Sequence, residues 1–216
     1  MKKYSHIIWD WNGTLLDDAR LLKDIVNNLL IRCGKDPLLD ETHRELFGFP
    51  VVNYYIRMGF DFTSYPFEQI CIDFTDEYYS RVKECRLRKD AIKVLSTIRD
   101  KGYTQSILSA SRDTSLARVL EHFKVREFFE DVVGLDNHSG GTKLDTGSVF
   151  IREKGLDPTG VILIGDTVHD FEVARGLGTD VLLLDSGYQT RARLCACGCP
   201  VIDTLPSVLQ HVTDSG

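Results

Sequence analysis

The sequence contains no long apolar run and no cluster of basic residues. No stretch approaches the roughly 20 apolar residues of a membrane-spanning helix, and the N-terminus lacks the apolar run and cleavage site of a signal peptide. The formal net charge of −6 at pH 7 disfavours nucleic acid or an anionic membrane as the partner. We therefore expect a soluble, cytoplasmic protein that binds a small molecule.

Cysteine is scarce, and two common catalytic motifs are missing. The 216 residues include six cysteines, too few for a disulfide framework. Cys195, Cys197 and Cys199 alternate, but no second pair or histidine stands at zinc-site spacing, which favours a thiol-rich loop. The sequence has neither the Gly-x-Ser-x-Gly elbow of serine hydrolases nor a complete nucleotide-binding loop around Lys143.

Strands and helices alternate from residue 89 to the C-terminus. The run Val161-Ile162-Leu163-Ile164 is apolar throughout, as in a strand buried on both faces of a parallel sheet. This alternation predicts an α/β, Rossmann-like fold with helices on both faces of a parallel sheet. The predicted strands cover residues 7–9, 103–108, 131–134, 161–164, 181–184 and 201–202.

Residues 17–86 interrupt this pattern with a run of helices. A stripe from Leu21 to Leu30 has helical spacing, with Asp17 or Asp18 as the predicted N-cap, and the longest helix is expected between Pro66 and Val82. We expect residues 17–86 to form an all-helical cap domain over the carboxyl ends of the strands. Residues 1–16 and 87–216 would then form the core.

Acidic residues follow two of the predicted strands. Asp10 comes directly after Ile7-Ile8-Trp9, while Asp166 and Asp170 follow the strand that ends at Ile164. Ligands of parallel sheets bind outside the carboxyl ends of the strands, so we expect these three carboxylates to converge. Close carboxylates need a cation to remain ionised, and hard oxygen ligands favour Mg²⁺.

Phosphoryl transfer is the chemistry that suits this set of residues. With the charge neutralised by a metal, Asp10 can attack phosphorus and form an aspartyl-phosphate. A transferring phosphoryl group also needs hydrogen-bond donors. The candidates are the Ser109 hydroxyl, the Lys143 ammonium and the backbone N–H groups of Gly13, Thr14 and Ala110.

The order of these motifs resembles that of the haloacid dehalogenase superfamily of phosphohydrolases. The resemblance rests on Asp10-Trp11-Asn12-Gly13-Thr14, Ser109 after an apolar strand, Lys143, and Gly165-Asp166 with Asp170. It covers nearly the whole chain, and the helical insertion resembles the phosphoglycolate phosphatase and beta-phosphoglucomutase branch. The resemblance implies that Asp10 is the nucleophile and that Ser109 and Lys143 hold the phosphate. It also implies that Asp10, the Asn12 carbonyl and Asp166 bind Mg²⁺, with Asp170 supporting them.

Asn12 departs from the pattern of these phosphatases, which carry a second aspartate as general acid and base. An amide cannot exchange a proton near neutral pH, and losing such a group typically costs about 10²–10⁴-fold in rate. Metal and phosphate binding should survive, because the metal ligand at position 12 is a main-chain oxygen. Acyl phosphates, aryl phosphates and pyrophosphate, whose leaving groups need no protonation, should be affected least.

The sequence therefore predicts a Mg²⁺-dependent phosphatase of a small phosphorylated metabolite, slowed or altered by Asn12. The alternatives are a phosphotransferase-like enzyme that accumulates aspartyl-phosphate and a non-hydrolytic, phosphate-binding regulatory protein of the same fold. Arg44 and Arg57 are expected in solvent, although either could reach a second anionic group of the substrate. The aromatic residues of the cap are expected in its core or against the substrate; they are Phe47, Phe49, Tyr54 and Tyr55.

Overall fold

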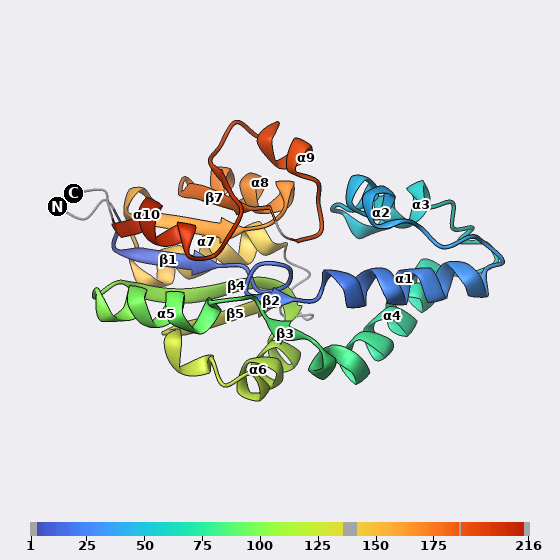
Figure 1. The fold of residues 1–216 in the computed structure, drawn as a ribbon, viewed down its shortest axis with the longest axis horizontal. Coiled ribbons are helices and arrows are strands. Elements are labelled where there is room, and N and C mark those ends of the chain that lie inside the picture. The colour runs from blue at the N-terminus through green and yellow to red at the C-terminus, as the bar shows by residue number, and fades with distance from the viewer. Residues whose placement is uncertain (1–3, 136–141, 186, 214–216) are drawn as a thin grey trace.

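A six-stranded parallel sheet forms the centre of the protein (Figure 1). The computed structural model describes residues 4–135, 142–185 and 187–213. The strand order is β5-β4-β1-β6-β7-β8, and every neighbouring pair is parallel. The strands are β1 (His6–Trp9), β4 (Thr104–Arg112), β5 (Asp131–Leu135), β6 (Val161–Gly165), β7 (Asp180–Leu184) and β8 (Val201–Ile202). The predicted α/β, Rossmann-like class is confirmed.

Alternate side chains of each strand enter two different apolar clusters. Ile7 and Trp9 of β1 belong to the larger cluster, whereas Ile8 between them belongs to the smaller one, as the two-residue period of a strand requires. Helices α5 (Ala91–Asp100), α6 (Asp113–His122) and α10 (Ser207–Thr213) pack on the larger cluster. Helices α7 (Lys143–Lys154) and α8 (Val168–Leu177) cover the other face, and the short α9 (Arg191–Cys195) precedes β8.

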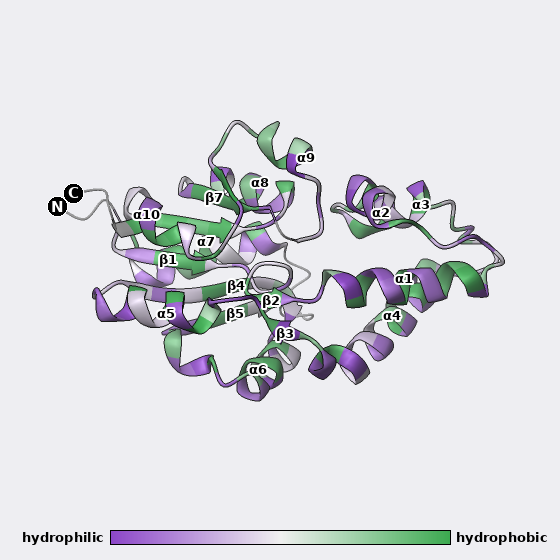
Figure 2. Ribbon diagram, in the orientation of Figure 1, coloured by the Kyte–Doolittle hydropathy of each residue, from purple (hydrophilic) through white to green (hydrophobic). Residues whose placement is uncertain are grey.

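Four helices stand beside the sheet rather than on its faces (Figure 1). We call them the helical insertion: α1 (Ala19–Arg32), α2 (Asp40–Leu46), α3 (Val51–Arg57) and α4 (Phe67–Arg81). The predicted stripe from Leu21 to Leu30 is buried along α1, which packs against α4 and shows both polar and apolar faces in Figure 2. At the base of the insertion, β2 (Leu16–Asp17) pairs antiparallel with β3 (Arg86–Leu87).

The loop that follows β7 contacts the helical insertion. Arg44, predicted in solvent, has a side chain that is 37% exposed and also donates to Asp185 at 2.9 Å and to the carbonyl of Gln189 at 2.7 Å. Arg193 donates to the carbonyl of Phe47 at 2.6 Å, and the ring of Phe47 lies 4.8 Å from that of Tyr188. These contacts hold the end of α2 against the core. Each one joins two residues that are about 140 positions apart in the sequence.

The predicted end of one strand is also wrong. β4 continues to Arg112, which pairs with Leu135 after an irregularity in the register, and α6 starts at Asp113. Ser109, Ala110 and Ser111 therefore belong to a distorted strand end and not to the start of a helix. Among the described residues, no helix combines the length and apolar character that a membrane span requires.

Candidate active site

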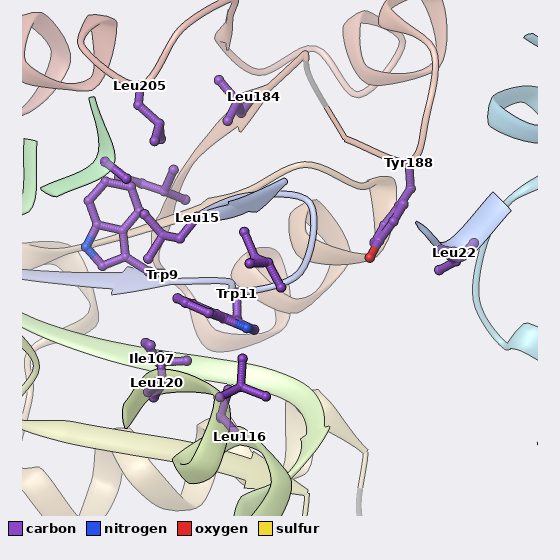
Figure 3. Close-up of a cluster of buried hydrophobic side chains, with 14 of the residues drawn as sticks. Trp9, Trp11, Leu15, Leu22, Ile107, Leu116, Leu120, Leu184, Tyr188 and Leu205 are labelled. Carbon is purple, nitrogen blue, oxygen red and sulfur yellow. The ribbon is translucent and has the colours of Figure 1, made fainter. Parts of the chain in front are cut away.

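Two buried indoles fix the backbone on either side of Asp10. The side chains of Trp9 and Trp11 are almost fully buried and share one cluster with Leu15 and Leu116 (Figure 3). Trp9 Nε1 donates to Gln105 Oε1 at 3.0 Å, and the Asp10 N–H donates to the Ile164 carbonyl at 2.8 Å. This packing aims the Asp10 carboxylate out of the end of β1.

Three buried carboxylates converge beyond the ends of β1 and β6. One oxygen from each of Asp10, Asp166 and Asp170 lies within 4.8 Å of the others. Asp166 follows β6, and Asp170 lies in the first turn of α8, where it forms a capping box with Thr167. The predicted convergence of these residues agrees with this geometry.

Lys143 is the cation at the centre of the carboxylates. Its Nζ lies 2.5 Å from Asp10 Oδ1 and 2.7 Å from Asp170 Oδ1, and the side chain is 3% exposed. Helix α7 starts at Lys143, after the N-cap Thr142, which forms a capping box with Asp145. The glycine-rich segment 136–141, part of the predicted loop before Lys143, lies outside the described residues.

The electrostatic environment makes the three carboxylates different. Burial raises the pKa of Asp10 to about 7, although the Lys143 ammonium acts in the opposite direction. Burial, with the charges of Asp10 and Asp170, raises the pKa of Asp166 well above its ordinary value. Burial also opposes the ionisation of Asp170, but the charge and hydrogen bond of Lys143, together with a hydrogen bond from Thr167, lower its pKa. The Lys143 ammonium thus pairs with two of the three acids, and Asp166 has no contact with it.

The donor set and the space around it fit a divalent cation. Carboxylate oxygens are the ligands that Mg²⁺ prefers, and further positive charge would favour ionisation of Asp10 and Asp166. Glycines leave room beside Asp166: a Cβ atom on Gly13 would lie 2.3 Å from its Oδ2, and one on Gly187 would lie 1.3 Å from the same atom. Any larger residue at either position would displace this carboxylate.

Every polar atom of the Asn12 side chain has a protein partner. Nδ2 donates to Asp18 Oδ2 at 2.7 Å and lies 2.6 Å from the Tyr78 hydroxyl oxygen. Oδ1 accepts from the Ser111 hydroxyl at 2.9 Å. The amide is therefore held in one orientation, with its two N–H groups committed to a carboxylate and a hydroxyl.

Asp18 is a buried carboxylate that sequence reasoning assigned to the wrong task. It stands at the N-cap position of α1, but its side chain makes no capping hydrogen bond. It accepts instead from the Gly13 N–H at 2.8 Å, from Asn12, and from the Tyr78 hydroxyl at 2.6 Å. Burial raises its pKa, and a hydrogen bond from Tyr188 also reaches it. A buried carboxylate needs such donors, which is why the turn supplies them.

Some of the predicted phosphate-binding groups already have hydrogen-bond partners within the protein. The Gly13 N–H donates to Asp18, so its predicted role as a phosphate donor is wrong for this structure. The Thr14 hydroxyl donates to Asp166 Oδ1 at 3.2 Å, and Ser109 Oγ accepts from the Ser111 N–H at 3.1 Å. Ser109 and Lys143 both line the cavity in front of Asp10, and Ala110 lines it from an exposed position.

That cavity has a volume of about 740 Å³ and lies between the sheet and the helical insertion. Asp10, Asn12, Asp166 and Lys143 line its base. Of the four aromatic residues predicted in the cap core or against the substrate, Phe47, Tyr54 and Tyr55 are buried, whereas Phe49 is 39% exposed. All four line the cavity, and their contact with a substrate stays a prediction. Sequence reasoning missed the roles of Tyr78 and Tyr188 beside Asp18, because no motif links the turn after β1 to residues 60 and more positions away.

The family model of haloacid dehalogenase-like hydrolases matches residues 7–184. This match includes Asp10, Lys143 and Asp166, the residues that the fold brings together. The chain belongs to the haloacid dehalogenase-like hydrolase family. The predicted superfamily is confirmed, and the family model's description, a hydrolase, agrees with the predicted enzyme class.

Relatives with two different names match the chain. It is 24% identical to a phosphoglycolate phosphatase of Synechococcus elongatus over 96% of both proteins. It is 23% identical to the tyrosine-protein kinase PtkA of Mycobacterium tuberculosis over 84% of this chain, but spans only 62% of that protein's length. A haloacid dehalogenase-like hydrolase from Streptococcus pneumoniae has the same fold, with a TM-score of 0.85, 19% identity and coverage of 98% and 99% of the two chains.

Proposed function

We propose that the protein is a Mg²⁺-dependent phosphohydrolase that acts on a small phosphorylated molecule through an aspartyl-phosphate on Asp10. The observation that carries this proposal is the convergence of Asp10, Asp166 and Asp170 at the base of a cavity, where Lys143 pairs with Asp10 and Asp170. Asp166, Asp10 and the Asn12 carbonyl would hold the metal, and Asp170 would support it. When bound, Mg²⁺ would offset the negative charge of the phosphoryl group.

The residues around Asp10 suit a two-step displacement. An Asp10 oxygen would attack phosphorus while the Lys143 ammonium, 2.5 Å from that carboxylate, holds it in place. The Ser109 hydroxyl and the backbone N–H groups of Ala110 and Thr14 would provide hydrogen bonds to the phosphoryl oxygens. Water would then attack the aspartyl-phosphate and restore the Asp10 carboxylate. The helical insertion, within the proposed cap of residues 17–86, would exclude bulk water and select the substrate.

A panel of phosphate compounds tests this proposal. Acetyl phosphate, pyrophosphate, aryl phosphates and alkyl phosphates would be incubated with the protein and Mg²⁺, and phosphoglycolate is included because a relative carries that name. We expect phosphate release that falls at least 10³-fold in Asp10→Ala and is unchanged in Asp24→Ala, whose carboxylate is on the surface of α1. Equal release by wild type and Asp10→Ala, or none by the wild type, would refute the proposal.

Asn12 supports a second candidate function, a phosphate-binding protein that does not turn over. All of its side-chain hydrogen-bonding atoms are occupied by Asp18, Tyr78 and Ser111, so none is left to activate water. This candidate predicts phosphate and Mg²⁺ binding with negligible phosphate release. A phosphotransferase would differ again, because a hydroxylamine-labile mass increase on Asp10 would appear after brief exposure to acetyl phosphate. Ordinary turnover numbers would exclude the binding protein.

A further inference from the structure

The cavity in front of Asp10 has an aromatic roof. Seven rings of the helical insertion line it, and they come from α3, α4 and the segment between α2 and α3. They belong to Phe47, Phe49, Tyr54, Tyr55, Phe74, Tyr78 and Tyr79. A volume of about 740 Å³ is far more than a phosphoryl group and a two-carbon acid would fill. The roof therefore suits a substrate with a large apolar portion.

Two of the tyrosines present rings rather than hydroxyls to the cavity. The Tyr54 hydroxyl lies 2.5 Å from His43 Nδ1, and the Tyr78 hydroxyl donates to Asp18 at 2.6 Å. Because these hydroxyls have buried partners, the surface left for a ligand is the apolar part of each side chain. Phe49 adds a ring that lies 4.6 Å from His169 of α8, so aromatic surface reaches the core side of the cavity.

The cations near the cavity are poorly placed for a second anionic group. Lys143 is held between Asp10 and Asp170, and Arg44 is held by Asp185 and the Gln189 carbonyl. Among the described lining residues, this leaves Arg112, an exposed side chain at the end of β4. For a second anionic group, a small substrate would thus have this one exposed guanidinium at the edge of a cavity that is otherwise lined mainly by rings.

We infer that the substrate is an aryl phosphate monoester, whose ring occupies the aromatic roof and leaves as a phenolate. This inference rests on the proposed phosphohydrolase function and names its substrate class. In the first step the bond between Asp10 Oδ and phosphorus forms, and the bond between phosphorus and the aryl oxygen breaks. The electron pair leaves on the phenolate, which takes a proton from solvent after departure. Water then forms a bond to phosphorus, the Asp10 bond breaks, and the proton of that water passes to solvent.

Asn12 and the aromatic roof favour the same substrates for different reasons. The amide is locked by its partners and has no proton to give to a leaving oxygen. A phenolate needs no such proton, whereas an alkoxide does. A ring-free acyl phosphate would also leave without a proton, but it would not fill the roof.

Four compounds separate the ring from the leaving group. Phenyl phosphate has both an aromatic ring and a good leaving group, benzyl phosphate has the ring on an alkoxide, acetyl phosphate has no ring, and phosphoglycolate is small and doubly anionic. Burying one ring is expected to lower KM roughly ten- to a hundredfold relative to acetyl phosphate. We expect benzyl phosphate to match phenyl phosphate in KM but to have a kcat at least about 100-fold lower.

The outcomes distinguish this inference from the proposed function. If acetyl phosphate is hydrolysed in an Asp10-dependent way but phenyl phosphate has no advantage in KM, the inference fails and the phosphohydrolase function stands. A preference for phosphoglycolate would have the same meaning. If no compound gives Asp10-dependent phosphate release, the proposed function itself fails.

A pair of variants on α4 tests the role of the roof. Phe74 lines the cavity and is half-buried, whereas Ile72 on the same helix is 52% exposed and does not line it. We expect Phe74→Ala to lower the ratio of kcat/KM for phenyl phosphate to that for acetyl phosphate by about five- to tenfold, and Ile72→Ala to leave it unchanged. Equal ratios in the two variants, with both proteins folded by circular dichroism, would overturn recognition of the ring by the roof.

Discussion

Two sets of buried groups lie beside Asp10, and they differ in how their buried negative charge is stabilised. In the charged set, Lys143, Asp166 and Asp170, three carboxylates lie together when Asp10 is included, and the ammonium pairs with two of them. In the amide set, Asn12, Asp18 and Tyr78, one carboxylate is surrounded by neutral donors. The first set lacks positive charge and so favours a cation. The second is already satisfied by hydrogen bonds and has no need of one.

This difference assigns separate tasks to the two sets. Under the proposed function, the charged set would bind the metal and hold the phosphoryl group, because added positive charge favours ionised carboxylates. The amide set cannot transfer a proton through Asn12, so under the same proposal it would fix structure beside the leaving group rather than assist departure. If the tasks are separate, a variant in one set should leave the contribution of the other set to stability and activity unchanged.

Removing the ammonium of the charged set should have the largest effect. Lys143→Met leaves Asp10 and Asp170 buried without their partner, which typically costs about 3–5 kcal/mol of unfolding free energy. Urea unfolding measures this loss. Lys154→Met is the matched control at the other end of α7, because the Lys154 side chain is 47% exposed and its pair with Asp131 should contribute about 1 kcal/mol or less. Similar losses in both variants would contradict a special role for Lys143.

The contacts of the amide set predict that Asn12→Asp alone does not restore full activity. A carboxylate at position 12 would stand beside Asp18, whose Oδ2 is 2.7 Å from the amide nitrogen, and two such carboxylates cannot both ionise. We expect the single variant to be less stable and to gain little activity. The double variant Asn12→Asp, Asp18→Asn restores one carboxylate and one amide.

Comparison of the single and double variants shows whether Asn12 alone limits hydrolysis or whether Asp18 has been accommodated to the amide at position 12. Hydrolysis of benzyl phosphate, whose alkoxide needs a proton, should rise about 10²-fold or more in the double variant, and thermal melting should recover toward the wild-type value. If the single variant alone is fully stable and equally active, Asp18 does not constrain position 12.

Sequence patterns identified the charged set more readily than the amide set. Asp10 and Asp166 each follow an apolar run, and the carboxyl ends of parallel strands meet at one edge, so local patterns predicted their convergence. A local pattern also drew attention to Asp18, but it predicted the wrong role. An acidic residue before a helical stripe indicates a helix cap, and the Asp18 side chain makes no capping hydrogen bond. Its partner Tyr78 lies 60 residues away on α4, and only the packing of α4 against α1 brings the two together.

The parts of the fold that depend on local patterns were predicted correctly, and the parts that depend on contacts between distant residues were not. Alternating apolar runs fixed the strands and their faces, whereas the extension of β4 to Arg112 depends on pairing with β5. The position of Arg44 depends on Asp185, which is distant in sequence. Contacts of this kind between distant segments leave no periodic signal in the chain.

The charged set should bind Mg²⁺ more tightly as pH rises toward neutrality. The folded-state pKa of Asp10, about 7, lies above its unfolded value of 3.8. In the metal-free protein, Asp10 therefore contributes stability below about pH 4 that is lost as pH rises through about 7. A cation binds the ionised form, so its apparent affinity should be about tenfold weaker at pH 6 than its limiting value above pH 7.

The increase in melting temperature on addition of MgCl₂, measured at pH 6 and pH 8, tests this expectation. The increase should be larger at pH 8, and Asp10→Asn should reduce the difference between the two pH values. A Mg²⁺ effect that is equal at both would show that Asp10 does not titrate with the metal. The raised pKa of Asp166 acts in the same direction, so some dependence should remain in the variant.

Removing one hydroxyl from the amide set should have the smallest effect. Tyr78→Phe deletes a donor to Asp18 Oδ2, while Gly13 and Asn12 still donate to that carboxylate. A hydrogen bond to a buried charged group contributes about 1.5–3 kcal/mol, and the remaining donors favour the lower end of that range. The adjacent Tyr79→Phe is the control, because its hydroxyl has no hydrogen-bond partner within the part of the chain that the structure describes. A double-mutant cycle of Tyr78→Phe with Asp18→Asn, followed by urea unfolding, should give a coupling of about 1 kcal/mol, whereas the cycle with Lys143→Met should give nearly none. Strong coupling of Tyr78 to Lys143 would mean that the two sets form one network, and the separation of metal binding from the leaving-group side would fail.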